Sequence, residues 1–376
     1  MTTFPRIAII GGGPGGLMLA RLLQVGGLSV IVFERDSHPG GRPQGGSLDL
    51  HGDTGLRAMR LARLEREFTA HARPEDQGDR LYDPDGNILF DHDGAGANRP
   101  EIDRAALRQI LLESLVPGTV RWGSKVDAIL PVGEQGWRVM ADGTPHDFDV
   151  VVGADGAWSR VRPLLTEARS SYEGITFVEF GYDARLHPEI DALAGGGKMF
   201  AIGDNRVMAA QRNGHQQIRG YAGFRAPEEE GRRLETLTAD EVRAVLRDVF
   251  AGWAPSLMRL IEVGDFIGVR SIYAMPVGHG WESRPGLTML GDAAHLMSPF
   301  AGEGVNLALA DAADLADALL SGGGWNAVAE AERRIAERAA PAAEEAHRGG
   351  EVRLSSRGVG PVLALYQRRL AAAAAD

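Results

Sequence analysis

The chain has 376 residues, a formal net charge of -11 and no cysteine. A chain of this length exceeds what one ordinary hydrophobic core supports, so we expect two domains or one elaborated domain. The negative charge and the lack of a basic cluster argue against nucleic acid or an anionic membrane surface as partners. The absence of cysteine excludes disulfides, thiolate catalysis and cysteine-based metal sites. The ten scattered histidines include no His-x-x-x-His pair, so no metal site is expected.

The apolar run from Ile7 to Val25 has the length of a signal peptide but not its composition. Glycines between positions 11 and 16 interrupt it, and Arg6 is the single basic residue before it. No other apolar run is long enough to span a membrane. We therefore expect a cytoplasmic protein without a membrane partner.

The first forty residues read as strand, loop, helix and strand. Residues 6–10 are strongly apolar, as a buried parallel strand should be, and 17–25 are typical of a helix. A second apolar strand over 29–33 ends at Glu34. The intervening loop 11–16 has the sequence Gly-Gly-Gly-Pro-Gly-Gly.

This loop carries a G-x-G-x-x-G motif in the context that gives the motif its meaning. Gly11 would make the tight turn, Gly13 would let a pyrophosphate come close and Gly16 would let the helix lie on the strand. Glu34 could accept a hydrogen bond from a ribose hydroxyl. The combination predicts dinucleotide binding, and no Gly-Lys-Ser/Thr sequence follows that would indicate a P-loop.

The middle of the chain contains further strands and helices and a second short motif. We expect a helix near 54–64, a hairpin over 82–90, a helix over 104–115 and strands over 120–130, 137–141 and 148–153. The last of these strands leads to Asp155-Gly156. Taken alone, that dipeptide fits an ordinary type I′ or left-handed turn after a strand.

From about residue 170 the pattern changes to longer strands with polar alternation. We expect strands over 174–185, 198–202, 206–212, 215–225 and 266–273, with helices near 239–250 and 255–261. Asn213-Gly214 is strong hairpin chemistry between two of them. The pattern predicts an antiparallel sheet in a second domain, able to offer one broad face to a substrate.

The last third contains another glycine-rich loop between a strand and a helix. An apolar strand over 287–290 precedes the loop 291–306, and an alanine- and leucine-rich helix runs from about 302 to 320. Such a helix start presents unpaired N–H groups and the positive end of a dipole to a ligand, and Gly302 and Gly304 permit close approach. A Gly-rich turn that merely caps a buried helix explains the stretch equally well in isolation. Further helices are expected over 325–347 and from 361, with breaks at Gly349-Gly350 and at 358–360.

Three motifs now stand in order: Gly11 to Gly16 with Glu34, Asp155-Gly156, and Gly291-Asp292 with Pro299 to Asn306. Together they resemble class A flavoprotein monooxygenases of the p-hydroxybenzoate hydroxylase type. Within this class the chain is most similar to the tetracycline-inactivating, Tet(X)-type enzymes, and the likeness extends over nearly the whole chain. It is carried by the segments 45–51, 100–104, 205–208 and 291–306.

The resemblance implies an α/β fold with a Rossmann-like FAD-binding domain of the glutathione reductase type, an antiparallel β-sheet substrate domain and a C-terminal helix. The FAD-binding domain would be discontinuous, over 1–170 and 275–345. The substrate domain would cover 171–274, and 346–376 would form a C-terminal helical segment. We allow that the hairpin over 79–92 packs with the substrate domain.

The resemblance also implies which residues bind FAD. Glu34 and Arg35 would serve its adenosine half, and Asp292 its ribityl and diphosphate region. Arg104 would contact the cofactor beside the isoalloxazine ring, and Arg42 would approach the flavin from a loop that faces the substrate. The full set implied is Gly11, Gly13, Gly16, Glu34, Arg35, Arg42, Asp49, Arg104, Asp155, Gly156, Asp292, Pro299, Gly302, Gly304, Val305 and Asn306.

No side chain is expected to act as a catalytic acid or base, because the chemistry would be borne by the flavin, with Arg42, Pro299 and Gly302 shaping the site. His295 is expected to be a structural hydrogen-bonding residue. The substrate contacts implied by the resemblance are Arg206, Met208, Arg219, Tyr182 and Phe300. The alternatives are that both sheet arginines face solvent and that Tyr182 is a packing aromatic.

The implied activity is FAD-dependent, NAD(P)H-consuming hydroxylation of a polycyclic aromatic or phenolic compound, such as a tetracycline-like antibiotic or a polyketide. NAD(P)H would bind transiently and reduce the flavin, and O₂ would form a C4a-hydroperoxide that delivers one oxygen. We expect a monomer. The alternatives are a flavin-dependent reductase or dehydrogenase of a polyketide or isoprenoid, and a non-catalytic flavin-binding sensor.

Overall fold

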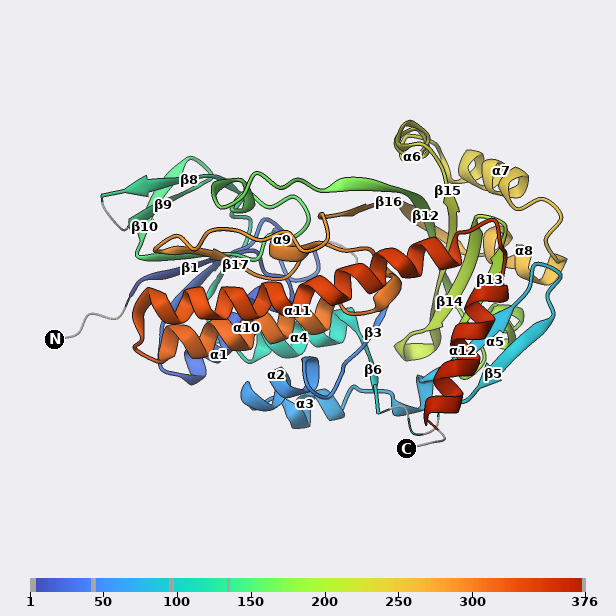
Figure 1. Ribbon diagram of the computed structural model, residues 1–376, viewed down its shortest axis with the longest axis horizontal. Helices are drawn as coiled ribbons and strands as arrows, with labels where there is room; N and C mark the ends of the chain where they lie inside the picture. The colour runs from blue at the N-terminus through green and yellow to red at the C-terminus, as the bar shows by residue number, and fades with distance from the viewer. Residues whose placement is uncertain (1–4, 42–44, 95, 97, 134–135, 374–376) are drawn as a thin grey trace. The chain divides into compact units, whose positions relative to one another are not determined.

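The computed structural model describes residues 5–373 except 42–44, 95, 97 and 134–135. The chain forms two compact units. Unit 1 comprises residues 1–71, 104–171 and 273–346, and unit 2 comprises residues 72–103, 172–272 and 347–376. Each unit contains its own large β-sheet (Figure 1).

A five-stranded sheet forms the centre of unit 1. Its strands follow the order β17 (Leu287–Met289), β11 (Val150–Gly153), β1 (Ile7–Ile10), β2 (Val30–Phe33) and β7 (Val120–Arg121). All neighbouring strands run parallel. The residues of β1, β11 and β17 are all buried, as in a sheet covered on both faces. The predicted Rossmann-like sheet is confirmed.

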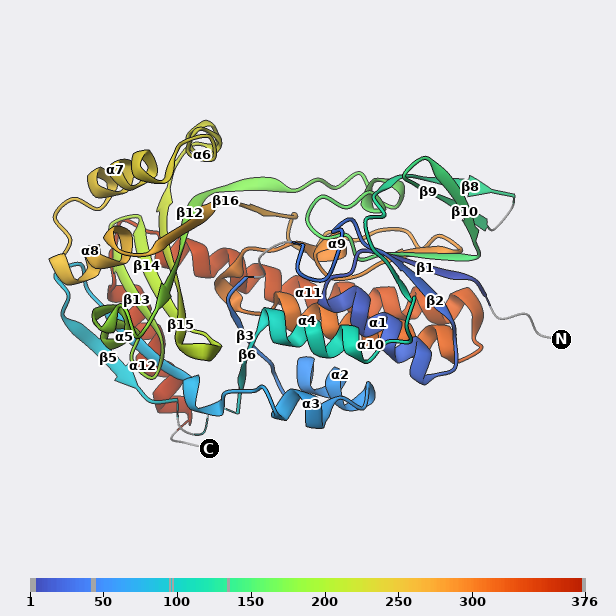
Figure 2. The ribbon, with the colours of Figure 1, turned by 180° about the vertical axis from the view of Figure 1, so that it is seen from behind.

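Helices and a second sheet cover the two faces of this central sheet. Helix α1 (Pro14–Val25) contacts β1 and β2, and beside it lie α4 (Arg104–Glu113) and α10 (Gly304–Leu320) (Figure 2). Ala8 and Ile10 of β1 pack into another core, together with aromatic residues of an antiparallel sheet. That sheet consists of β8 (Val126–Val132), β9 (Gly136–Ala141) and β10 (Thr144–Phe148).

The single strand predicted over 120–130 is wrong. The chain turns at Gly123, which has a φ of +67°, and passes from β7 of the parallel sheet to β8 of the antiparallel one. Strand β10 was not predicted, because Pro145, His146 and Asp147 break the apolar alternation. In this region the sequence pattern therefore located strands more reliably than it indicated the sheet to which each strand belongs.

A seven-stranded sheet forms the centre of unit 2. Its order is β16 (Asp265–Ala274), β12 (Ser171–Asp183), β15 (Gln217–Arg225), β14 (Arg206–Arg212), β13 (Gly197–Gly203), β4 (Gly78–Tyr82) and β5 (Ile88–His92). Strands β12, β15, β14 and β13 pair antiparallel, as predicted. One face packs on α5 (Pro188–Ala194), α6 (Glu228–Leu234), α7 (Ala239–Val249) and α8 (Pro255–Glu262).

Two helices end the chain. Helix α11 (Gly324–Arg353) runs through Gly349-Gly350, so the predicted break there is wrong. Glycine inside a helix costs only about 1 kcal/mol, which a long packed helix tolerates. Helix α12 begins at Gly360 after Gly358, which has a φ of +63°, as the second predicted break requires.

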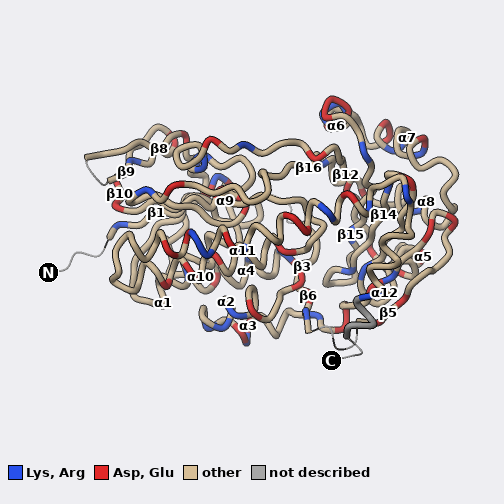
Figure 3. The backbone as a smooth tube through the Cα atoms, in the orientation of Figure 1, with Lys and Arg blue, Asp and Glu red and all other residues tan. Residues whose placement is uncertain are grey.

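Among the described residues, no helix has the length and hydropathy needed to cross a membrane. Over the same part of the chain, acidic and basic residues are interspersed in both units (Figure 3). This distribution agrees with the absence of a basic cluster in the sequence.

Candidate functional site

The three loops predicted to bind the cofactor follow three neighbouring strands of unit 1. Ile10 is in register with Gly153 in the parallel sheet, and Gly153 with Met289. The loops that begin at Gly11, Ala154 and Leu290 therefore leave the same edge of the sheet. Ligands of open α/β sheets bind at the carboxyl ends of the strands, which is this edge.

The glycines of the first loop have distinct surroundings. Gly11 has a φ of +111°, and a Cβ there would lie 2.3 Å from the carbonyl oxygen of Ala154. A Cβ on Gly16 would lie 2.2 Å from the carbonyl oxygen of Gly11. A Cβ on Gly13 would meet nothing within 4 Å. The tight turn and the helix packing thus use Gly11 and Gly16, whereas Gly13 borders open space.

Glu34 holds the first loop from the end of β2. Its carboxylate accepts hydrogen bonds from the N–H groups of Gly12 (2.8 Å) and Asp36 (2.9 Å), and the residue is 4% exposed. The neighbouring Arg35 is exposed. The acid at the predicted ribose position is therefore already fixed by main-chain donors.

Arg108 supports the same loop and was not predicted. It is buried on α4 and donates to the carbonyl oxygens of Gly12 (3.2 Å) and Pro39 (2.6 Å). Its guanidinium also lies over the ring of Trp122, 5.3 Å from the centroid. An arginine among the apolar residues of a helix was the available signal.

Arg162 joins the second loop to the third, and it too was not predicted. It is 6% exposed and donates to the carbonyl oxygens of Asp292 (2.7 Å), Ala293 (2.7 Å) and Ala157 (3.0 Å). Burial lowers the pKa of Arg162, and Asp155 and Asp292 partly offset this effect. One side chain thus fixes the two loops against each other.

Among the described residues, only one of the two carboxylate oxygens of Asp155 has a hydrogen-bond partner. Its Oδ2 accepts from the N–H of Arg160 (2.6 Å), whereas the buried Oδ1 has no hydrogen-bond partner there. Burial raises the pKa of Asp155, and local hydrogen bonds and Arg162 oppose this rise. A buried, unpaired oxygen favours a ligand that donates a hydrogen bond.

The third loop is anchored by a buried ion network. The loop contains the short helix α9 (Asp292–His295), and Gly291 before it donates its N–H to Oδ2 of Asp311 (3.0 Å). The same oxygen lies 2.6 Å from Nε2 of His295, and Oδ1 accepts from Arg338 (2.9 Å). Burial lowers the pKa of His295, but Asp311 outweighs this effect and the pKa is raised. His295 therefore has the structural position that was expected.

The start of α10 is joined to β3 (Ser47–Asp49) by Asn306. The Asn306 amide accepts from the N–H of His51 (2.9 Å) and donates to the carbonyl oxygen of Asp49 (2.9 Å). Gly302 adopts the left-handed conformation with a φ of +72°. A Cβ on Gly304 would meet nothing within 4 Å, so the first turn of α10 borders open space.

The other predicted site residues of unit 1 differ in burial and in hydrogen bonding. The buried Nε of Arg104 has no hydrogen-bond partner among the described residues. Asp292 and Pro299 are exposed, and Phe300 and Val305 are half-buried. Arg42 lies outside the described residues.

Tyr182 and Met208 lie in the core of unit 2, which corrects their assignment to substrate contact. Both belong to the sheet face that packs on the helices, and they are 2% and 0% exposed. The hydroxyl of Tyr182 donates to the carbonyl oxygen of Leu260. Both positions were assigned from the family resemblance, which does not identify the face of this sheet that the helices cover.

Arg206 also lies on the helix-covered face. It donates to the carbonyl oxygens of Val249 (2.6 Å) and Asp204 (3.0 Å), and it lies over the ring of Trp253. It lines an open groove of about 530 Å³ in unit 2. These contacts give Arg206 a structural role, and its substrate contact stays a prediction.

Arg219 lies on the opposite face of the same sheet. Its Nη1 is 3.6 Å from Oε1 of Glu179, which also accepts from Arg270 through Oε2 (2.8 Å). Glu179 is 2% exposed. Phe177 and Tyr221 share this face and have ring centroids 6.3 Å apart.

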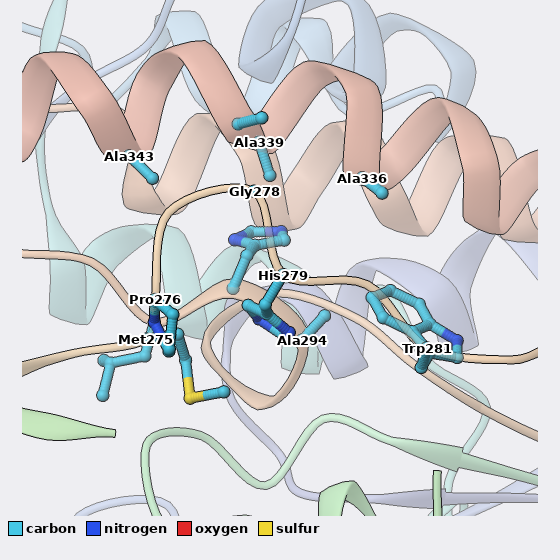
Figure 4. A pocket seen from close by; sticks show the side chains of 12 residues that line it. Met275, Pro276, Gly278, His279, Trp281, Ala294, Ala336, Ala339 and Ala343 are labelled. Atoms are coloured by element: carbon cyan, nitrogen blue, oxygen red, sulfur yellow. The ribbon is translucent and has the colours of Figure 1, made fainter. Parts of the chain in front are cut away.

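A small cavity lies behind α9 in unit 1. Ala336, Ala339 and Ala343 of α11 line one side, and Met275, His279 and Trp281 belong to the loop opposite (Figure 4). Its volume of about 10 Å³ leaves room for a single water molecule at most. It is therefore too small for an organic substrate.

Comparisons with known proteins identify the family of this chain. Residues 5–345 match the family model described as FAD binding domain. Monooxygenase asqM of Emericella nidulans is 33% identical over 370 residues, covering 84% of this chain and 83% of asqM. The 3-amino-4-hydroxybenzoate 2-monooxygenase PtmB3 of Streptomyces platensis is 31% identical and covers 92% and 86% of the two chains.

The fold is also similar to solved structures. Klebsiella pneumoniae HpxO complexed with FAD and uric acid has a TM-score of 0.80 and 22% identity, and the match covers 96% of this chain and 92% of HpxO. The tetracycline destructase Tet(55) has a TM-score of 0.75 and 20% identity, with 98% and 95% covered. The predicted family and its FAD cofactor are confirmed, and this chain belongs to the FAD-binding-domain family of class A flavin-dependent monooxygenases.

Proposed function

We propose that this monooxygenase consumes NAD(P)H and hydroxylates a polycyclic aromatic or phenolic compound, with tetracycline-like antibiotics and polyketides as the first candidates. The observation that carries the flavin part of the proposal is the position of the three loops at one edge of the parallel sheet. We also propose that the protein acts as a monomer in the cytoplasm.

The residues at this edge fit FAD. Open space beside Gly13 suits a pyrophosphate, which the N-terminus of α1 would favour electrostatically. The unpaired Oδ1 of Asp155 suits a hydroxyl donor of the cofactor. The open first turn at Gly304 would receive the isoalloxazine ring, whose electron-rich edge suits the α10 N-terminus.

The flavin, when bound, supplies the redox chemistry with a nicotinamide and O₂. The chain holds the loops in place before the cofactor arrives. Arg162 fixes the second loop to the third, Asp311 fixes the turn at Gly291, and Asn306 fixes the start of α10. Preorganised loops reduce the ordering cost of binding and hold the reacting groups in position.

The face of the unit 2 sheet that carries Arg219 has the chemistry that an aromatic substrate needs. Phe177 and Tyr221 offer aromatic surface, and Arg219 and Arg270 offer donors beside the buried Glu179. Phenolic or enolic oxygens would be recognised by such donors. We therefore propose Arg219 as a substrate contact.

The test is a panel of tetracyclines, phenolic polyketides and simple hydroxybenzoates incubated with the FAD-loaded protein. NADH and NADPH consumption is recorded for each compound, and each product is analysed by mass. We expect one group of compounds to accelerate consumption and to gain one oxygen atom, taken from ¹⁸O₂. Reduction of a compound without oxygen gain would favour a reductase, and consumption indifferent to every compound would favour a sensor.

A further inference from the structure

His51 lies between two carboxylates beside the start of α10. Its Nδ1 is 3.3 Å from Oε1 of Glu303, and its Nε2 is 3.5 Å from Oδ2 of Asp49. The three side chains are 22%, 27% and 16% exposed, in the order His51, Glu303 and Asp49. Partial burial weakens solvent screening, so both carboxylates favour a protonated ring.

The two carboxylates belong to the two segments that Asn306 also joins. Asp49 ends β3, and Glu303 stands between Gly302 and Gly304, directly before α10. Asn306 is completely buried and bridges the main chain of residues 49–51. The ring of His51 thus adds a side-chain link to an existing main-chain link.

We propose that protonated His51 is a positioning residue that clamps Asp49 to Glu303 and thereby holds the loop 302–306 in the conformation that binds the flavin. This inference rests on the proposed flavin site. The three side chains carry a net charge of one negative unit when the ring is protonated and two when it is neutral. Loss of the proton therefore removes both attractions and leaves two carboxylates facing a neutral ring.

The charges around the ring set the pH at which the clamp opens. Asp49 from β3 and Glu303, which directly precedes α10, act on the ring. Arg57 of the neighbouring α2 (Gly55–Leu61) pairs with Asp314 (3.7 Å). The interaction with Asp49, followed by that with Glu303, raises the pKa of His51 to about 9 against the effect of burial. The clamp is therefore complete below the ordinary histidine pKa of about 6.5 and is lost as the pH rises through about 9.

The first test follows the ring directly in protein without FAD. Proton NMR of the histidine rings is recorded against pH, and the His51→Gln spectrum identifies the His51 signal. We expect His51 to titrate near pH 9 and Glu303→Gln to move its midpoint to lower pH. A midpoint near the ordinary value of about 6.5, or one that Glu303→Gln leaves unmoved, would overturn the clamp.

The second test measures the FAD dissociation constant against pH by flavin fluorescence. The wild type should bind evenly between about pH 6 and pH 8 and more weakly above about pH 9. His51→Gln should bind about tenfold more weakly near pH 7 and lack the alkaline decline. An alkaline decline in His51→Gln equal to that of the wild type would refute the proposal.

The matched control is His71→Gln. His71 belongs to the same unit, is exposed, and its Nδ1 lies 2.9 Å from the carbonyl oxygen of Glu67. The same substitution there should leave the wild-type pH profile intact. If none of the proteins binds FAD, the proposed flavin site fails, and the NMR titration still decides whether the clamp exists.

Discussion

Arg162 and Asp292 are joined through the main chain, because Nη2 of Arg162 donates to the carbonyl oxygen of Asp292 over 2.7 Å. The bond uses the backbone of Asp292 and leaves its exposed carboxylate available to a ligand. The residue that shapes the loop and the residue that would contact the cofactor are therefore different. Their roles can be separated by mutation.

Arg162→Lys should destabilise the protein by about 2–4 kcal/mol. Lysine keeps the charge, but it cannot reach the carbonyl oxygens of Asp292, Ala293 and Ala157 at once, and each hydrogen bond from a charged donor contributes about 1.5–3 kcal/mol. Urea unfolding of the FAD-free protein measures the change. Arg160→Lys is the control, since Arg160 is exposed. Equal midpoints for the two variants would contradict this role of Arg162.

Asp292→Ala should lower FAD retention and leave the stability of the FAD-free protein within about 0.5 kcal/mol of the wild type. The carboxylate is exposed, so its attraction for Arg162 and His295 contributes little to stability. Flavin absorbance relative to protein absorbance, after desalting, gives the retention. Asp53→Ala, at another exposed aspartate of unit 1, should retain FAD normally. Unchanged flavin content in Asp292→Ala would count against its assignment to the cofactor.

Two glycine substitutions in the G-x-G-x-x-G motif should affect different properties. Gly16→Ala places a Cβ 2.2 Å from the carbonyl oxygen of Gly11 and should cost about 3 kcal/mol of folding stability. Gly13→Ala meets nothing within 4 Å at a φ of -76°, so the fold should keep its stability. The added methyl group would occupy the proposed pyrophosphate space and weaken FAD binding. Thermal unfolding and FAD titration of both variants check the pair, and normal FAD binding by Gly13→Ala would remove the pyrophosphate from this position.

Asp311→Asn should destabilise the protein by about 3–5 kcal/mol, because it leaves His295 without its buried counter-ion and leaves Arg338 with Asp314 alone. Burial raises the pKa of Asp311, but His295 and Arg338 lower it further than burial raises it. The wild type should therefore lose this stabilisation below about pH 4, as the aspartate protonates.

The same network predicts a second loss at alkaline pH. The raised pKa of His295 means that its contribution is complete below the ordinary value of about 6.5 and declines as the pH rises through the folded pKa. Stability curves against pH should show both declines in the wild type and in the control Asp317→Asn, which changes an exposed residue of α10. A pH profile of Asp311→Asn parallel to that of the wild type would show that the network does not titrate as proposed.

Tyr182→Phe and Arg219→Lys separate packing from substrate contact. Tyr182→Phe removes the buried hydroxyl that donates to the carbonyl oxygen of Leu260. It should cost about 1–2 kcal/mol of folding stability without changing KM. The second keeps a cation beside Glu179 but loses the planar fork, and should raise KM about tenfold. Substrate-stimulated NAD(P)H oxidation and urea unfolding provide the two readouts. A KM effect in Tyr182→Phe would restore it as a pocket residue.

The parallel sheet and its loops could be predicted because local sequence determines them. β1, β11 and β17 are short apolar runs, and the chain turns after them at Gly11, at Ala154 and at Leu290-Gly291. The open space at Gly13 and the tight packing at Gly16 agree with the spacing of the motif. These features depend on neighbours within a few residues, so the sequence is sufficient.

The supporting residues could not be predicted because their partners come from distant segments. Arg108 and Arg162 donate to main-chain carbonyl oxygens, which leave no mark on the sequence of the partner. The role of Asp311 could not be predicted for the same reason, because it accepts a hydrogen bond from the backbone N–H of Gly291. Tyr182 and Met208 were misplaced for a related reason, because the helices that cover their face had to be located first.

The strand order has a consequence for how the chain folds during synthesis. Strand β11 pairs with β1 on one edge and with β17 on the other, and α1 packs on α10. A nascent chain that has not yet reached β17 exposes an apolar, unpaired edge of β11 and an uncovered side of α1. Such long-range pairing folds slowly. The apolar edge of β11 and the open side of α1 are therefore covered only after β17 and α10 have been synthesised.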